Sequence, residues 1–80
     1  MSDIREGYAR LWDYGYIVTE DAPMRGMLVV NELMRIERGF VGMPDNEETR
    51  LSRRNQVLSL LRGEESKRYV VRVENHDRTF

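Results

Sequence analysis

The side chains best suited to chemistry in this chain are arginines, and they gather in its C-terminal half. The segment ETRLSRRNQVLSLLRGEESKRYVVRVE, residues 48–74, holds the single lysine and six of the twelve arginines. A guanidinium group binds a carboxylate or a phosphate through paired, charge-assisted hydrogen bonds. The segment therefore indicates either a surface that binds an anionic partner or a solvated basic rim on an ordinary helix and strand.

Three of these arginines share one side of an expected helix with its apolar residues, which are Val57, Leu58 and Leu61. Helical spacing places Arg50 and Arg54 on that same face, with Arg53 beside them. An unpaired charge cannot be buried cheaply. The arginines must therefore reach water beyond the core, face a partner, or pair with acids of the N-terminal half, such as Asp13, Glu20 and Asp21.

We expect a small protein-binding module without catalytic activity, which regulates or inhibits a larger partner that has an acidic patch. Arg, Tyr, Trp and Met are enriched at protein interfaces, and the chain has twelve, four, one and five of them. The expected contacts are the charged Arg50, Arg53 and Arg54 and the apolar Tyr14 and Met24. Size and the absence of cysteine associate the chain with phage and mobile-element products that block host proteins, although no motif supports that association.

The alternative is a nucleic-acid-binding protein that uses the basic segment 50–72 as a helix and wing. No strand is expected after Glu74 to complete a wing, and the net charge is −1. The helix also starts with acidic side chains, which are Asp45, Glu47 and Glu48. Proteins that bind the phosphate backbone usually carry a clear positive excess, so these features favour a protein partner.

The small net charge hides an uneven distribution along the chain. Residues 1–48 carry five Arg against ten Asp and Glu, whereas residues 49–73 carry seven Lys and Arg against two Glu. Residues 74–80 add one negative charge. Such a split can mark an interaction surface, or the two parts can attract each other within the fold. A homodimer that covers the edge strand is a further possibility.

Catalytic, metal and cofactor chemistry have little support in the sequence. There is no cysteine, and the one histidine, His76, lies in a polar tail, so we expect no zinc site. The carboxylates of PDNEE, residues 44–48, lack the spacing of a calcium loop and suit a helix cap instead. We find no phosphate-binding glycine pattern and no nucleophile elbow. We therefore expect no enzyme, no metal and no cofactor.

Length and hydropathy limit the architecture. Eighty residues predict a single small globular domain, 1–80, in which residues 75–80 form a frayed tail. The longest apolar run, residues 27–30, is too short to span a membrane, and the charged N-terminus lacks the apolar core of a signal peptide. We expect a cytoplasmic protein that does not contact membranes.

Hydrophobic periodicity predicts the first two helices. One begins at Ser2, ends near Gly15 and buries a stripe formed by Ile4, Tyr8, Leu11 and Trp12. Tyr14 then remains as the exposed aromatic. The other helix runs from Pro23 to Arg38 and stops at Gly39. On this helix Met24 and Leu28 lie near the polar face, where they are either covered by the first helix or a loop or left exposed.

The third helix is expected from Asn46 to Arg62, with Asp45 as its N-cap and Gly63 as its stop. Two segments have strand character, Tyr16–Glu20 and Tyr69–Glu74. Since backbone groups of a lone strand would stay unpaired, these two segments should pair with each other. The sequence thus predicts an α+β fold with a three-helix core and a two-stranded sheet; an all-α small bundle is the alternative.

Overall fold

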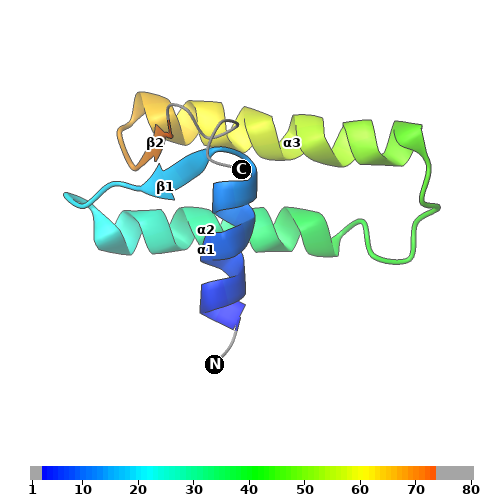
Figure 1. The fold of residues 1–80 in the computed structure, drawn as a ribbon, viewed down its shortest axis with the longest axis horizontal. Helices are drawn as coiled ribbons and strands as arrows, with labels where there is room; N and C mark the ends of the chain where they lie inside the picture. The colour runs from blue at the N-terminus through cyan, green and yellow to red at the C-terminus, as the bar shows by residue number, and fades with distance from the viewer. Residues whose placement is uncertain (1–2, 74–80) are drawn as a thin grey trace.

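The structure, a computed structural model, describes residues 3–73. Its elements are α1 (Asp3–Asp13), β1 (Tyr16–Val18), α2 (Pro23–Arg38), α3 (Glu47–Ser66) and β2 (Val70–Arg72). Helices α2 and α3 form an antiparallel hairpin, α1 crosses α2, and the sheet lies at the end of the hairpin where α3 finishes (Figure 1). The expected α+β architecture is confirmed.

The two strands pair as expected but are shorter than expected. They are antiparallel, with Tyr16 opposite Arg72, Ile17 opposite Val71 and Val18 opposite Val70. After Val18 the Thr19 amide still donates to the Tyr69 carbonyl at 3.1 Å, and the chain then turns toward α2, where the Ala22 amide donates to the Thr19 carbonyl at 3.2 Å. The turn ends the ladder on one side; Glu74, expected to extend it on the other, lies outside the described residues.

Helix α2 has the expected bounds and lies at the centre of the fold. Pro23 occupies its first turn, where its missing amide hydrogen costs nothing. The buried core comprises Leu11, Tyr16, Val29, Val30, Leu33, Val57, Leu61 and Val70. Three of these eight side chains come from α2, so this helix contributes more of the core than any other element.

Helix α1 packs on a face that shares Leu11 with the expected stripe but is otherwise different. Tyr8 is exposed, Trp12 is half-buried, and Tyr14 is half-buried against the core. The buried face contains Gly7 and Leu11, because a glycine lets the backbone of α1 approach α2 closely. A Cβ on Gly7 would collide with Val30. The expected stripe ignored this close approach, since a glycine adds nothing to a hydrophobic pattern.

Helix α3 differs from expectation at both ends. The Asn46 side chain, and not Asp45, caps it, since Asn46 Oδ1 accepts from the Thr49 amide at 2.8 Å. The helix also continues through Gly63. It ends in a Schellman motif, in which the amides of Tyr69 and Arg68 donate to the carbonyls of Glu64 and Glu65 at 3.0 and 2.9 Å.

The residue in the left-handed conformation of this motif is Arg68, with φ of 66°. Glycine is the usual residue at such a position. The pairing of β2 with β1 fixes where α3 must end. This pairing outweighs the local preference of Gly63 for ending a helix.

Two glycines in helices should respond in opposite ways to substitution by alanine. Gly63 lies inside α3 with open space around it, so Gly63→Ala should stabilise the protein by about 0.5–1 kcal/mol. Gly26 touches Val18, so a Cβ there would collide with that side chain, and Gly26→Ala should destabilise by about 1–3 kcal/mol. Urea unfolding followed by circular dichroism measures both. Equal effects of the two substitutions would contradict the close packing of α2 against β1.

Candidate functional site

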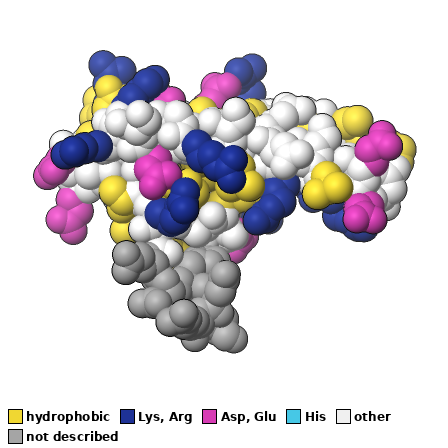
Figure 2. All heavy atoms as spheres, turned by 90° about the horizontal axis from the view of Figure 1, so that it is seen from above, with side chains coloured by type: hydrophobic (Ala, Val, Ile, Leu, Met, Phe, Trp, Pro, Cys, Tyr) yellow, Lys and Arg dark blue, Asp and Glu magenta, His cyan; other side chains and the backbone are white. Residues whose placement is uncertain are grey.

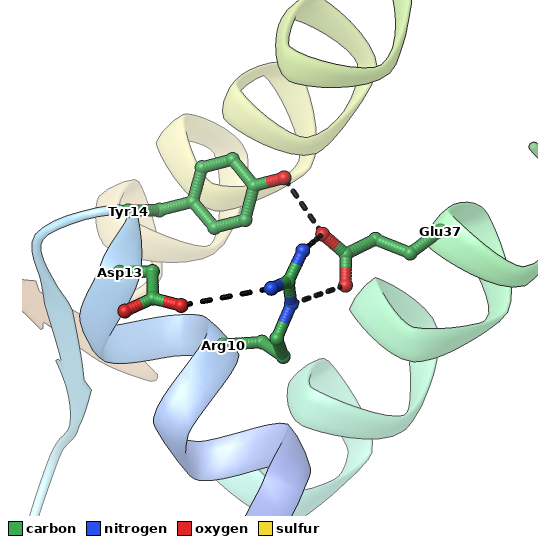
Figure 3. A network of polar contacts seen from close by, with 4 residues as sticks. All are labelled: Arg10, Asp13, Tyr14 and Glu37. Carbon is green, nitrogen blue, oxygen red and sulfur yellow. Dashed lines mark hydrogen bonds and ion pairs between the residues drawn. The ribbon is translucent and has the colours of Figure 1, made fainter. Parts of the chain in front are cut away.

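A polar network joins the end of α1 to α2. Arg10 donates from Nε to Glu37 Oε1 at 2.9 Å and from Nη2 to Oε2 at 2.7 Å. The Tyr14 hydroxyl donates to the same Oε2 at 2.8 Å, and Asp13 lies 3.7 Å from Arg10 Nη1. Figure 3 shows the Arg10 and Tyr14 side chains converging on Glu37 from α1 and the residue after it.

The network sets the charge states of its members. Burial works to raise the pKa of Glu37, but the hydrogen bonds from Arg10 and Tyr14 outweigh burial and hold that pKa below its usual range. Burial, together with the hydrogen bond to Glu37, raises the pKa of Tyr14 to about 12. The hydrogen bond with Glu37 raises the pKa of Arg10. Glu37 is therefore an anion and Tyr14 a neutral donor at neutral pH.

Next to this network, a hollow of about 410 Å³ separates α3 from the end of α1 and the sheet. We call it the α3 groove. It is lined by Asp13, Tyr14, Gly15, Tyr16, Arg54, Leu58, Arg62, Arg72 and Val73. Figure 2 looks down on α3 and shows Lys and Arg side chains around hydrophobic ones near the middle of this face. Acidic side chains lie at the right-hand end, where α3 begins, and others lie among the basic side chains and at the left-hand end.

One of the groove arginines is held in place by neighbours. Arg72 Nη2 donates to Tyr16 Oη and to Glu65 Oε1, each at 3.3 Å, and its guanidinium lies 5.8 Å from the centre of the Tyr16 ring. Tyr16 Oη in turn donates to Glu65 Oε1 at 2.9 Å. The antiparallel register produces this arrangement, because it places Arg72 directly opposite Tyr16.

The other two groove arginines have guanidinium groups that can bind a partner. Arg54 and Arg62 are exposed, and no ion pair within residues 3–73 includes either of them. They lie eight residues apart on α3 with Leu58 between them, so helical spacing puts all three side chains on one side of the helix. The groove therefore combines guanidinium groups with an apolar side chain.

The structure separates the three arginines expected to act together. Arg50 is exposed and pairs with Asp45, with its Nη1 at 3.0 Å from Asp45 Oδ1. Arg53 is half-buried and lines a different hollow with Glu37, whose pKa it helps to lower. Only Arg54 lines the α3 groove. None of the three forms an ion pair with Asp13, Glu20 or Asp21 among the described residues.

The two expected apolar contacts also differ in their surroundings. Tyr14 lines the groove, but its hydroxyl is committed to Glu37, so the expectation of an exposed aromatic was wrong. Met24 is 72% exposed and Leu28 is 55% exposed, so neither α1 nor a loop covers them. Met24 does not line the groove.

Arg62 and Arg72 line the groove but were not among the expected protein contacts, although both lie in the basic segment 50–72 of the nucleic-acid alternative. Arg62 has a recoverable signal, because it follows Arg54 and Leu58 at helical spacing. Arg72 has none, since its position depends on the strand register. His76 lies outside the described residues, as does the expected tail 75–80. Among residues 3–73, no three His, Cys, Asp or Glu side chains gather as metal ligands would.

The helices that the structure describes are each too short or too polar to cross a bilayer. Comparisons with protein-family models, with curated proteins and with solved structures gave no significant match to this chain. The groove is therefore the feature of this chain that indicates a function.

We expect Glu37→Gln to destabilise the protein by about 1–2 kcal/mol at neutral pH, because two donors lose their charged acceptor. Glu32→Gln is the matched control, since the Glu32–Arg35 pair on the same helix is exposed and should contribute little. A lowered folded-state pKa means that Glu37 stabilises the fold above about pH 4.5, and that this contribution disappears on acidification. Urea midpoints measured against pH should show this loss in the wild type and not in Glu37→Gln.

Tyr14 should ionise at a pKa of about 12, above the ordinary value of 10.0. A raised folded-state pKa means that its contribution to stability is complete below about pH 10 and disappears as the pH rises through 12. Tyrosinate absorbance during an alkaline titration measures this, with Tyr14→Phe as the comparison. A Tyr14→Phe variant that retains the same late-ionising component would show that another tyrosine is responsible.

Proposed function

We propose that this chain is a non-catalytic protein-binding module, and that its α3 groove holds an acidic segment of a larger partner protein. The observation that carries the proposal is the position of three guanidinium groups, those of Arg54, Arg62 and Arg72, around one hollow of about 410 Å³. Arginines clustered in this way favour carboxylates or phosphates, which they bind through paired hydrogen bonds.

The composition of the groove favours a protein partner over nucleic acid. Leu58 and the ring of Tyr14 give the hollow apolar surface, which suits a segment with both carboxylates and aliphatic side chains. Asp13 also lines the groove, so a continuous phosphate backbone would meet a negative charge there, whereas the carboxylates of a short segment can be spaced to reach the arginines alone. The start of α3 adds Glu47 and Glu48 on the same helix, so a nucleic acid laid along α3 would meet negative charge.

Part of the groove is already fixed in a single chain. Arg72 is held by Tyr16 and Glu65, and Tyr14 is held by Glu37, so neither needs to be ordered on binding. Such preorganisation lowers the entropic cost of association. A module of this kind regulates its partner by occupying the acidic segment, which then cannot bind anything else.

The test measures fluorescence anisotropy of two labelled probes with the full chain. One probe is a short amphipathic peptide with Glu and Leu at helical spacing, and the other is a short DNA duplex. Arg54→Glu combined with Arg62→Glu should weaken peptide binding by at least about tenfold. Arg5→Glu combined with Arg38→Glu changes the net charge equally at exposed sites outside the groove and should leave binding nearly unchanged.

Triple replacement of Arg50, Arg53 and Arg54 by Ala tests the surface indicated by the sequence. Because Arg54 is the only member of this triplet that lines the groove, the triple variant should stay folded and lose part of the peptide binding. Equal loss in the groove variant and in the Arg5/Arg38 control would refute the groove. Tighter binding of the duplex, with a steep loss on adding salt, would instead establish nucleic-acid binding.

A further inference from the structure

Helix α3 carries an exposed stripe that extends beyond the groove toward the start of the helix. Its members are Glu47, Leu51, Arg54, Leu58 and Arg62, which follow one another at intervals of three or four residues. Side chains at these intervals share one face of a helix. Leu51 is 51% exposed, Leu58 is half-buried, and the three charged members are exposed. The single chain therefore leaves this stripe largely uncovered.

The two ends of the stripe are complementary to each other when a second copy of the helix is reversed. Consider a second α3 laid antiparallel on the first, with a two-fold axis between Arg54 and Asn55. Glu47 of each copy then lies opposite Arg62 of the other. Leu51 lies opposite Leu58, so the apolar residues meet as well, while the two copies of Arg54 lie beside each other at the axis and must turn outward into water. The symmetry repeats each contact, and opposite charges face each other at both ends.

The shape of the molecule leaves room for this arrangement. The first half of α3 extends past α1 and the sheet, as Figure 1 shows. Residues 45–52 are exposed apart from the half-buried Thr49. The second half of α3 borders the groove. An antiparallel pair therefore places the exposed acidic start of each α3, with Glu47 and Glu48, beside the basic groove of its partner.

We propose that two copies of this chain associate through α3 in this antiparallel arrangement. The inference rests on the proposed function only in treating the groove as a docking site for an acidic segment. The segment is here the start of α3 in a second copy, which carries Glu47 and Leu51. Self-association would cover Arg62 and Leu58, so a dimer and a foreign acidic segment compete for the same groove.

The proposed contact is small, which sets its expected strength. From Glu47 to Arg62 the helix extends about 22 Å, so a single helix pair buries less surface than a typical stable dimer. The dimer should therefore form reversibly and only at high protein concentration. Because its end contacts are exposed ion pairs, added salt should weaken it.

Analytical ultracentrifugation of the full chain over a range of concentrations, at low and high salt, tests the proposal. Glu47→Arg alone and Arg62→Glu alone each place like charges together at both ends and should weaken dimerisation by at least about tenfold. An equimolar mixture of the two variants should restore it, because opposite charges face each other again at both ends. Glu20→Arg and Arg5→Glu, at exposed positions outside α3, serve as charge-matched controls.

A wild-type chain that stays monomeric at every concentration in low salt would overturn the proposal. So would a dimer that the two charge reversals leave intact, or a mixture that fails to restore association while circular dichroism shows folded protein. Glu47 does not line the groove, so Glu47→Arg should keep the binding of the acidic peptide. Dimerisation without any peptide binding would refute the proposed function alone, and peptide binding without dimerisation would refute this inference alone.

Discussion

The Glu37 carboxylate links the end of α1 and the residue after it to α2. It exposes only 13% of its side chain, and it accepts hydrogen bonds from Arg10 within α1 and from Tyr14 just after it. The chain then turns at Gly15, whose φ of 86° suits glycine, and enters β1 at Tyr16. Because β2 pairs with β1, the position of β1 also sets the position of Arg72 in the groove. That position therefore depends indirectly on a carboxylate of α2.

Three helices, two paired strands and the bounds of α2 could be predicted from periodicity and from Pro23. The face of α1 could not, because the decisive residue is Gly7, which contributes close approach and no hydrophobicity. The end of α3 could not either, because strand pairing carries the helix through Gly63 and places Arg68 in a conformation that glycine would favour. Local signals fail at both places for one reason: contacts between elements outweigh them.

The candidate site shows the same division between local and long-range information. Arg54 follows from the helical pattern, and Arg62 was recoverable from the same pattern. Arg72 and Tyr16 come together only through a register that joins residues 56 positions apart. Arg53 differs from its prediction. The helical pattern groups it with Arg54, whereas in the structure it lies near Glu37. Of the cations in the basic segment, Arg53 thus lies near an acid of the first part of the chain, whereas Arg54 and Arg62 stay open at the surface.

The hairpin is unevenly supported along its length. Val57 and Leu61 anchor the second half of α3 in the core, whereas every residue from 41 to 48 is exposed. Local opening costs least where few apolar contacts are lost. The loop and the first turn of α3 can therefore fray and reclose many times while the strands, Leu61 and the groove remain assembled, so transient disorder at that tip does not propagate to the opposite end of the molecule.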